Sequence, residues 1–237
     1  SYQTAWLKTH HRAEYMAALM SVECGNTEKV LNFISDCKRN KFDSIKILFP
    51  DINESQLYFD VPKDNRKQIR YGLGAIKGAG EKAIRSILAS RDNVNGKFNS
   101  FMHCLEQLDY QTVNKRLLEN LIKCGAFDWT EHTRRSLLSI LPKAVDLAQE
   151  TQDNKRKGQF SLFGGAVKAP ELTIPDEGEW PLGEKMDHEF SALGMYITSH
   201  PLMAYEDVVE QNNLGTSQRF ADASLKDACR IAGIVCN

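Results

Sequence analysis

The stretch Tyr71–Leu88, YGLGAIKGAGEKAIRSIL, decides the fold of the central part of the chain. Apolar residues recur at helical spacing on both sides of the run Gly78-Ala79-Gly80. A glycine inside a helix costs roughly 1 kcal/mol relative to alanine, so two of them break the helical pattern. The stretch therefore predicts two short helices joined by a glycine hairpin, between about residues 69 and 90.

Six apolar side chains around the two glycines would face one another across such a hairpin and form a miniature core. They are Leu73, Ile76, Ala79, Ala83, Ile84 and Ile87. The amides of the turn and of the second helix's first turn would then point outward together, with the helix dipole behind them. That arrangement suits a phosphate. The candidate phosphate-binding residues are Lys77, Gly78, Ala79, Gly80, Lys82 and Arg85.

This pattern resembles the helix-hairpin-helix motif of DNA-binding proteins, which grips a backbone phosphate without reading base sequence. Ala79 departs from the larger apolar residue usual at its position, which weakens the miniature core but leaves the amide geometry intact. The alternative is a tight corner between two helices that binds no ligand.

Charge is unevenly distributed along the chain, although the net charge is only −1. Residues 61–97 carry nine Lys and Arg against three acids, whereas residues 169–210 carry ten acids and one Lys. Such a division indicates one part that meets a polyanion and another that avoids it. Two solvated faces of opposite sign would give the same count.

The composition is that of an ordinary globular protein, with 42% hydrophobic and 26% charged residues. No apolar run approaches the ~18 residues needed to span a bilayer, and no signal peptide is evident. The six cysteines are scattered without a CxxC pair, which favours a reducing cytosol over a zinc site or disulfide framework. The chain enters a helical pattern at once and ends in a strand-like run, so we expect a fragment of a longer protein.

The periodicity predicts a mainly helical α+β fold with a small antiparallel sheet. The expected helices are two or three within residues 2–40, capped at Asn26 or Thr27, and others at 100–108, 112–124, 133–148 and 183–197. Asn99 is the expected N-cap of the helix at 100–108. Gly125 is the expected C′ residue of the helix at 112–124. The three expected strands are 45–49, 56–61 and 68–71. Residues 151–158, which lack apolar side chains, and 166–182, rich in proline, are expected to be irregular.

The segment QFSLF, Gln159-Phe160-Ser161-Leu162-Phe163, carries three large apolar residues within this expected linker. Such a peptide suits insertion into a preformed groove, with the glutamine fixing its register. It resembles the bacterial sliding-clamp-binding pentapeptide, Gln-x-Ser/Asp-Leu-Phe. The alternative is a loop that folds its phenylalanines onto its own core.

Further ordered stretches extend this resemblance over essentially the whole chain. They are YQTAWLK at 2–8, PDINES at 50–55, YGLGAIKG at 71–78, LIKCGAFD at 121–128 and LGMYITSHPL at 193–202. Together they resemble the alpha subunits of bacterial replicative DNA polymerases of the C family.

The resemblance implies a fragment with three parts. Residues 1–40 would end the fingers domain, 41–205 would form the clamp-binding domain, and 206–237 would connect to the first strand of a truncated OB-fold domain. Its implied partners are double-stranded DNA, the sliding clamp (beta subunit) and other replicase subunits, in the bacterial cytoplasm and without a membrane. The family's Mg²⁺-dependent polymerase chemistry uses palm-domain aspartates. This sequence has no Asp-x-Asp pair, so we expect no catalytic residue or cofactor here and no activity of the fragment alone.

No metal site is expected from the histidines or acids. His10 and His11 are adjacent on a helix and point about 100° apart, so they cannot chelate one ion. His200 precedes Pro201 and is expected to orient a helix end. The acids Glu184, Asp187 and Glu189 have helical spacing, which we interpret as a solvated face. A helix-hairpin-helix nuclease or ligase would need a carboxylate cluster that we do not find, whereas an interaction scaffold without DNA binding remains open.

Overall fold

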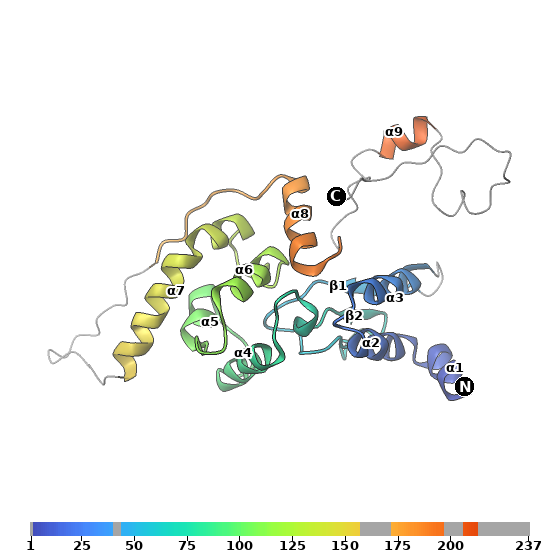
Figure 1. Cartoon of the computed structure of the whole chain (residues 1–237), viewed down its shortest axis with the longest axis horizontal. Helices are drawn as coiled ribbons and strands as arrows, with labels where there is room; N and C mark the ends of the chain where they lie inside the picture. The colour runs from blue at the N-terminus through green and yellow to red at the C-terminus, as the bar shows by residue number, and fades with distance from the viewer. Residues whose placement is uncertain (1, 40–43, 157–171, 197–205, 213–237) are drawn as a thin grey trace.

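The computed structural model describes residues 2–39, 44–156, 172–196 and 206–212, and is mainly helical (Figure 1). Its elements are α1 (Tyr2–His10), α2 (Arg12–Val22), α3 (Thr27–Arg39), β1 (Lys46–Leu48), β2 (Gln68–Arg70), the 3₁₀ turn η1 (Leu73–Ala75), α4 (Glu81–Asn93), α5 (Phe101–Gln107), α6 (Lys115–Lys123), α7 (Arg134–Arg156), α8 (Leu182–Leu193) and α9 (Glu206–Gln211). Helices α1–α3 and the strands lie at one end, and α4–α7 at the other. Within the described ranges no helix is both long and apolar enough to cross a membrane.

The sheet is where the expected fold is partly wrong, because β1 and β2 pair in parallel and not antiparallel. Ile47 lies opposite Ile69, and both are buried. The segment 56–61 forms no strand; it contributes one antiparallel bridge, between Asp60 and Arg70. The chain turns at 50–55 and returns along the other side of β2, so β2 has a parallel neighbour on one edge and an antiparallel bridge on the other.

Helix ends are set largely by short polar side chains and glycines. The Asn26 side chain accepts a hydrogen bond from the Lys29 amide (3.1 Å), so the expected cap of α3 is confirmed. At α5 the cap is Ser100 and not Asn99, because the Ser100 hydroxyl accepts from the His103 amide at 3.0 Å. Helix α6 ends as expected before Gly125, whose φ of +86° places it in the left-handed region.

Helix α7 extends to Arg156. The prediction of an irregular linker from residue 151 is therefore wrong for residues 151–156. The polar run is held by tertiary contacts. The Gln152 side-chain amide donates to the carbonyls of Glu106 (3.0 Å) and Leu108 (2.8 Å), at the end of α5. A polar sequence can therefore remain helical when another element uses its side chains.

One continuous apolar core joins the two ends of the molecule. It contains Met16 and Met20 of α2, Ile69 of β2, and the apolar faces of α4, α6 and α7. Of the six residues expected to form the miniature core, five are buried, and Ala79 packs against them half-buried. Those positions were therefore predicted correctly, although they belong to a larger core.

Candidate nucleic-acid interface

The hairpin between η1 and α4 forms at the expected glycines, but its first helix is only a three-residue 3₁₀ turn. Gly72 lies so close to the backbone of Tyr58 and Phe59 that a Cβ there would be 2.5 Å from the Tyr58 carbonyl carbon. Ile76 is already extended (ψ 136°), and Gly78 then takes a φ of +77°. The segment between β2 and Gly78 therefore forms one 3₁₀ turn in place of the expected first helix.

The start of α4 offers a group of backbone donors. Gly80 is its N-cap and has no side chain to bond the first-turn amides. The Ala79 amide donates to the Ile76 carbonyl (3.0 Å), and the Ile84 amide to the Gly80 carbonyl (3.1 Å). Within the described residues, the amides of Gly78, Gly80, Glu81 and Lys82 have no acceptor. A helix start with free donors and a positive dipole end attracts an anion.

The charged side chains at this start are arranged differently from the sequence expectation. Lys82 is exposed and makes no ion pair among the described residues. Arg85 bonds Glu81 one turn back, at 2.7 and 2.8 Å, and this hydrogen bond raises the pKa of Arg85. Glu81 also places a negative charge in the first turn, where it competes with a phosphate. Lys82 is therefore the cation best placed for an anion at these amides.

Lys77 lies on the other side of the turn and faces α8. Its amide donates to the Ala192 carbonyl (2.8 Å), and its ammonium lies 3.4 Å from the Phe190 carbonyl. Its own carbonyl accepts from the Asn120 side chain of α6 at 2.8 Å. Asn120, Phe190 and Ala192 were missed by the sequence analysis, since nothing in local spacing links α6 and α8 to the hairpin.

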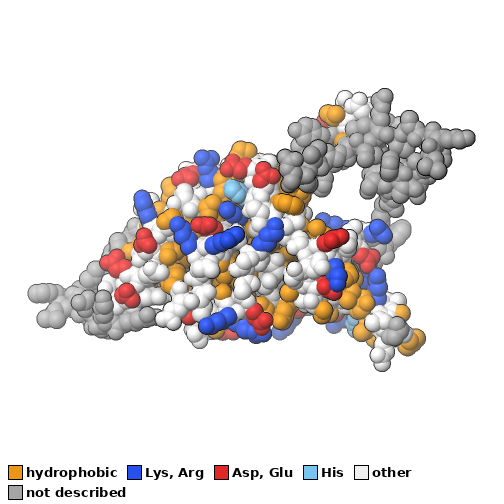
Figure 2. Space-filling model, viewed as in Figure 1, with side chains coloured by type: hydrophobic (Ala, Val, Ile, Leu, Met, Phe, Trp, Pro, Cys, Tyr) orange, Lys and Arg blue, Asp and Glu red, His pale blue; other side chains and the backbone are white. Residues whose placement is uncertain are grey.

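The nine cations counted in residues 61–97 do not form one free basic surface. Arg91 is buried, and donates to the carbonyls of Ile52 and Ser55. Arg66, Arg85 and Lys97 each lie within 4.0 Å of a carboxylate. On the face drawn in Figure 2, Lys and Arg side chains alternate with Asp and Glu. The net charge of +6 over residues 61–97 is therefore larger than the positive charge available to bind a polyanion.

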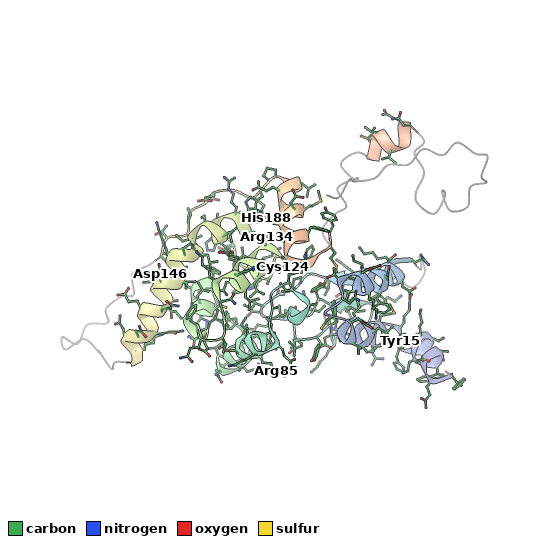
Figure 3. The ribbon with its side chains drawn as sticks, in the orientation of Figure 1. Tyr15, Arg85, Cys124, Arg134, Asp146 and His188 are labelled. Carbon is green, nitrogen blue, oxygen red and sulfur yellow. The ribbon has the colours of Figure 1, made fainter. Side chains whose placement is uncertain are left out.

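The acidic cluster of α8 is not a solvated face at every position. Glu189 is completely buried and pairs with Arg134 of α7 at 2.9 Å. Arg134 also binds Asp128 through two hydrogen bonds (2.7 and 2.6 Å) and donates to the Lys123 carbonyl (3.1 Å). Burial opposes the guanidinium charge, but the bonds to Asp128 and Glu189 outweigh it and raise the pKa of Arg134. In Figure 3, Arg134 lies where α6, α7 and α8 meet.

Other candidate positions can be placed only in part. Gln159–Phe163 and His200 lie outside the described residues. The rings of His10 and His11 contact Trp6, with centroids 4.8 and 5.4 Å away. Over the described ranges, no three His, Cys, Asp or Glu side chains gather in a way that could hold a metal ion.

Comparisons with known proteins agree with this geometry. Residues 44–137, which include the hairpin, match the family described as "Helix-hairpin-helix motif". A protein of Neisseria meningitidis serogroup A is 39% identical over 236 residues, which cover 99% of this chain and 20% of the relative. The chain is similar to DNA polymerase III subunit alpha.

The same name belongs to relatives in two further bacteria. DNA polymerase III subunit alpha of Pseudomonas aeruginosa is 35% identical over 257 residues, covering 100% of this chain and 21% of the relative. That of Escherichia coli K12 is 38% identical over 214 residues, covering 89% and 18%. The chain thus spans about one fifth of the length of these curated relatives, and the resemblance to bacterial polymerase alpha subunits is confirmed.

Proposed function

We propose that this chain is the part of a bacterial replicative DNA polymerase that grips duplex DNA and docks on the sliding clamp. In this proposal it makes template-directed synthesis processive. Nucleotide transfer and the Mg²⁺ that it needs belong to other parts of the longer cytoplasmic polymerase. The observation that carries the proposal is the hairpin. Among the residues that the structure describes, the amides of Gly78, Gly80, Glu81 and Lys82 have no acceptor, and the Lys82 side chain on the same turn is exposed.

These donors suit a phosphate oxygen and offer nothing that distinguishes one base from another. Backbone amides and a lysine contact the part of DNA that is the same in every sequence. Binding should therefore be independent of sequence and should weaken steeply with salt, since each neutralised phosphate contributes about −0.9 to the log–log slope.

Clamp docking is supported by the sequence pattern of Gln159–Phe163. The helix-hairpin-helix match on the same chain adds to that support. A clamp that encircles DNA would make the hairpin's contact intramolecular, so a weak contact would be sufficient. Clamp docking and DNA binding thus support each other in one function.

The DNA part is tested by fluorescence anisotropy of a labelled duplex across a salt series, with the parent chain and Lys82→Met. The parent should bind duplexes of unrelated sequence equally, and Lys82→Met should lower the slope by about 0.9. Lys143→Met of α7, also an exposed lysine, is the matched control and should leave the slope unchanged. Absence of salt-dependent binding by the parent would favour the interaction scaffold.

The clamp part is tested separately, by binding to a bacterial sliding clamp. Leu162→Ala with Phe163→Ala should abolish binding, because both anchors of the peptide are removed. Phe160→Ala is the matched control, since the pattern leaves its position variable. Equal binding by all three chains would show that another surface holds the clamp.

A further inference from the structure

Lys77 is bound to the C-terminal end of α8 through both its backbone and its side chain. Its amide donates to the Ala192 carbonyl at 2.8 Å. Its ammonium lies 3.4 Å from the Phe190 carbonyl and 5.5 Å from the centroid of the Phe190 ring. The last carbonyls of a helix carry partial negative charge, which favours a cation. The exposed Lys77 ammonium therefore already has an acceptor within the protein.

The neighbours of Lys77 hold it in this place. Asn120 of α6 donates to the Lys77 carbonyl at 2.8 Å, so the backbone N–H and C=O of Lys77 are both in use. Gly194 ends α8 with a φ of +75°, and a Cβ there would lie 3.2 Å from Cε of Lys77. The end of α8 is thus shaped to admit the lysine stem.

Helix α8 is itself a fixed support. Glu189, the residue before Phe190, makes the buried ion pair with Arg134. Lys77, the residue before Gly78, therefore connects the hairpin to an element that is anchored in the core. Lys82 lies in the first turn of α4 and, like Lys77, is exposed and has no ion pair among the described residues; its ammonium, however, has no hydrogen-bond acceptor there.

We infer that Lys77 is a positioning residue, which fixes the hairpin against α8, whereas Lys82 supplies the phosphate contact. This assignment rests on the proposed DNA-binding function of the hairpin. It differs from the sequence expectation, which treated the two lysines alike.

The distinction is measurable as a salt slope. We compare Lys77→Met and Lys82→Met with the parent chain in duplex binding at five or more salt concentrations. Lys82→Met should lower the slope by about 0.9, because one phosphate contact is lost. Lys77→Met should weaken binding about two- to fivefold at every salt concentration, with the parent's slope. A slope lowered equally by both variants would overturn the inference.

Phe190→Ala tests the same support without touching a charge. Phe190 cannot neutralise a phosphate, so a fall in affinity with an unchanged slope shows action through the hairpin. Because Phe190 and Lys77 act together, the double variant should bind little worse than either single variant. Fully additive losses, or no loss from Phe190→Ala, would count against the inference.

Amide hydrogen exchange gives a readout that does not depend on DNA. The Ala79 amide, bonded to the Ile76 carbonyl inside the turn, should exchange faster in Lys77→Met and Phe190→Ala, and unchanged in Lys82→Met. Should the parent chain fail to bind DNA, the proposed function falls and this measurement alone decides the role of Lys77. Equal exchange in all four proteins would refute that role.

Discussion

Arg134 and Arg85 both pair with carboxylates, yet their surroundings differ completely (Figure 3). The Arg134 side chain is 3% exposed and bonds two carboxylates, one of which is completely buried. The Arg85 side chain is 61% exposed, and its partner Glu81 is also exposed to solvent. A buried pair cannot lose one member without stranding a charge, whereas an exposed pair can exchange its partner for water or a phosphate. For these two arginines, burial separates a structural cation from one available for binding.

The largest effect is expected from Arg134→Met. Glu189 would remain buried after losing the Arg134 cation, and removing one member of a buried pair costs about 3–5 kcal/mol. Asp128, with its side chain 45% exposed, can turn to water and adds less. Urea unfolding followed by circular dichroism measures the loss in the free energy of unfolding.

The neighbouring Arg135→Met is the matched control for this loss. Arg135 is half exposed and lies 3.8 Å from Glu177, so its removal should cost less than about 1 kcal/mol. The double variant Arg134→Met with Glu189→Met should recover much of the loss, because it leaves no buried charge. If Arg134→Met costs no more than Arg135→Met, the buried cluster is not what holds α8.

A second large effect is expected from Gly125→Ala. Gly125 has a φ of +86°, and a Cβ there would collide with the Arg134 guanidinium and lie 2.7 Å from Asp128. Gly96 has a similar φ of +84°, with nothing within 4 Å of its Cβ position. Gly96→Ala should therefore cost only the left-handed backbone, about 1 kcal/mol. Gly125→Ala should cost at least about 1 kcal/mol more, measured by thermal unfolding, and equal losses would mean that Arg134 moves aside freely.

These elements show which features local sequence can predict. The apolar faces of α4 and α6 and the left-handed Gly125 follow from patterns within one turn or one helix. Strand direction does not, since parallel and antiparallel strands share the same short apolar pattern and the path of residues 49–67 decides. The burial of Glu189 depends on Arg134, 55 positions earlier, which no helical spacing can indicate.

The hairpin was likewise predictable as a turn and not as a set of contacts. Glycine spacing located Gly78 and Gly80, because only the local backbone is involved. The partners of Lys77 come from α6 and α8, so the sequence could not separate Lys77 from Lys82. Contacts between distant segments therefore decide which residues of a correctly located motif are free to bind.

A smaller effect, in the opposite direction, is expected from Glu81→Gln on DNA binding. The change removes an acid from the first turn of α4 and frees Arg85, which no longer has a carboxylate one turn back. Affinity for duplex DNA should rise about two- to fivefold, and the salt slope should steepen by about 0.9 if Arg85 then reaches a phosphate. Anisotropy in the same salt series measures both. Weaker binding by Glu81→Gln would show that the Glu81–Arg85 pair itself shapes the site.

The smallest effect concerns the pH dependence of the free energy of unfolding, through His188 of α8. The His188 ring packs against Trp180, with ring centroids 4.2 Å apart and the ring planes tilted by 47°. Burial, and then the nearby Lys123 of α6, lower the pKa of His188 below 6.5, although Glu184 and Asp187 of α8 oppose this. The unfolded chain therefore takes up a proton near pH 6.5 that the folded protein still resists, so stability falls as the pH decreases through that value.

His188→Gln should remove this contribution. Between pH 7.5 and 5.5 the free energy of unfolding of the parent should fall more than that of the variant, as measured by urea unfolding at each pH. The other five histidines are common to both chains and cancel in the comparison. A parent that loses no more stability than the variant would show that the exposed part of the ring accepts its proton without cost. A larger loss in the parent would show that α8 packs best with His188 uncharged, in contrast to Arg134, whose buried charge is matched by Glu189.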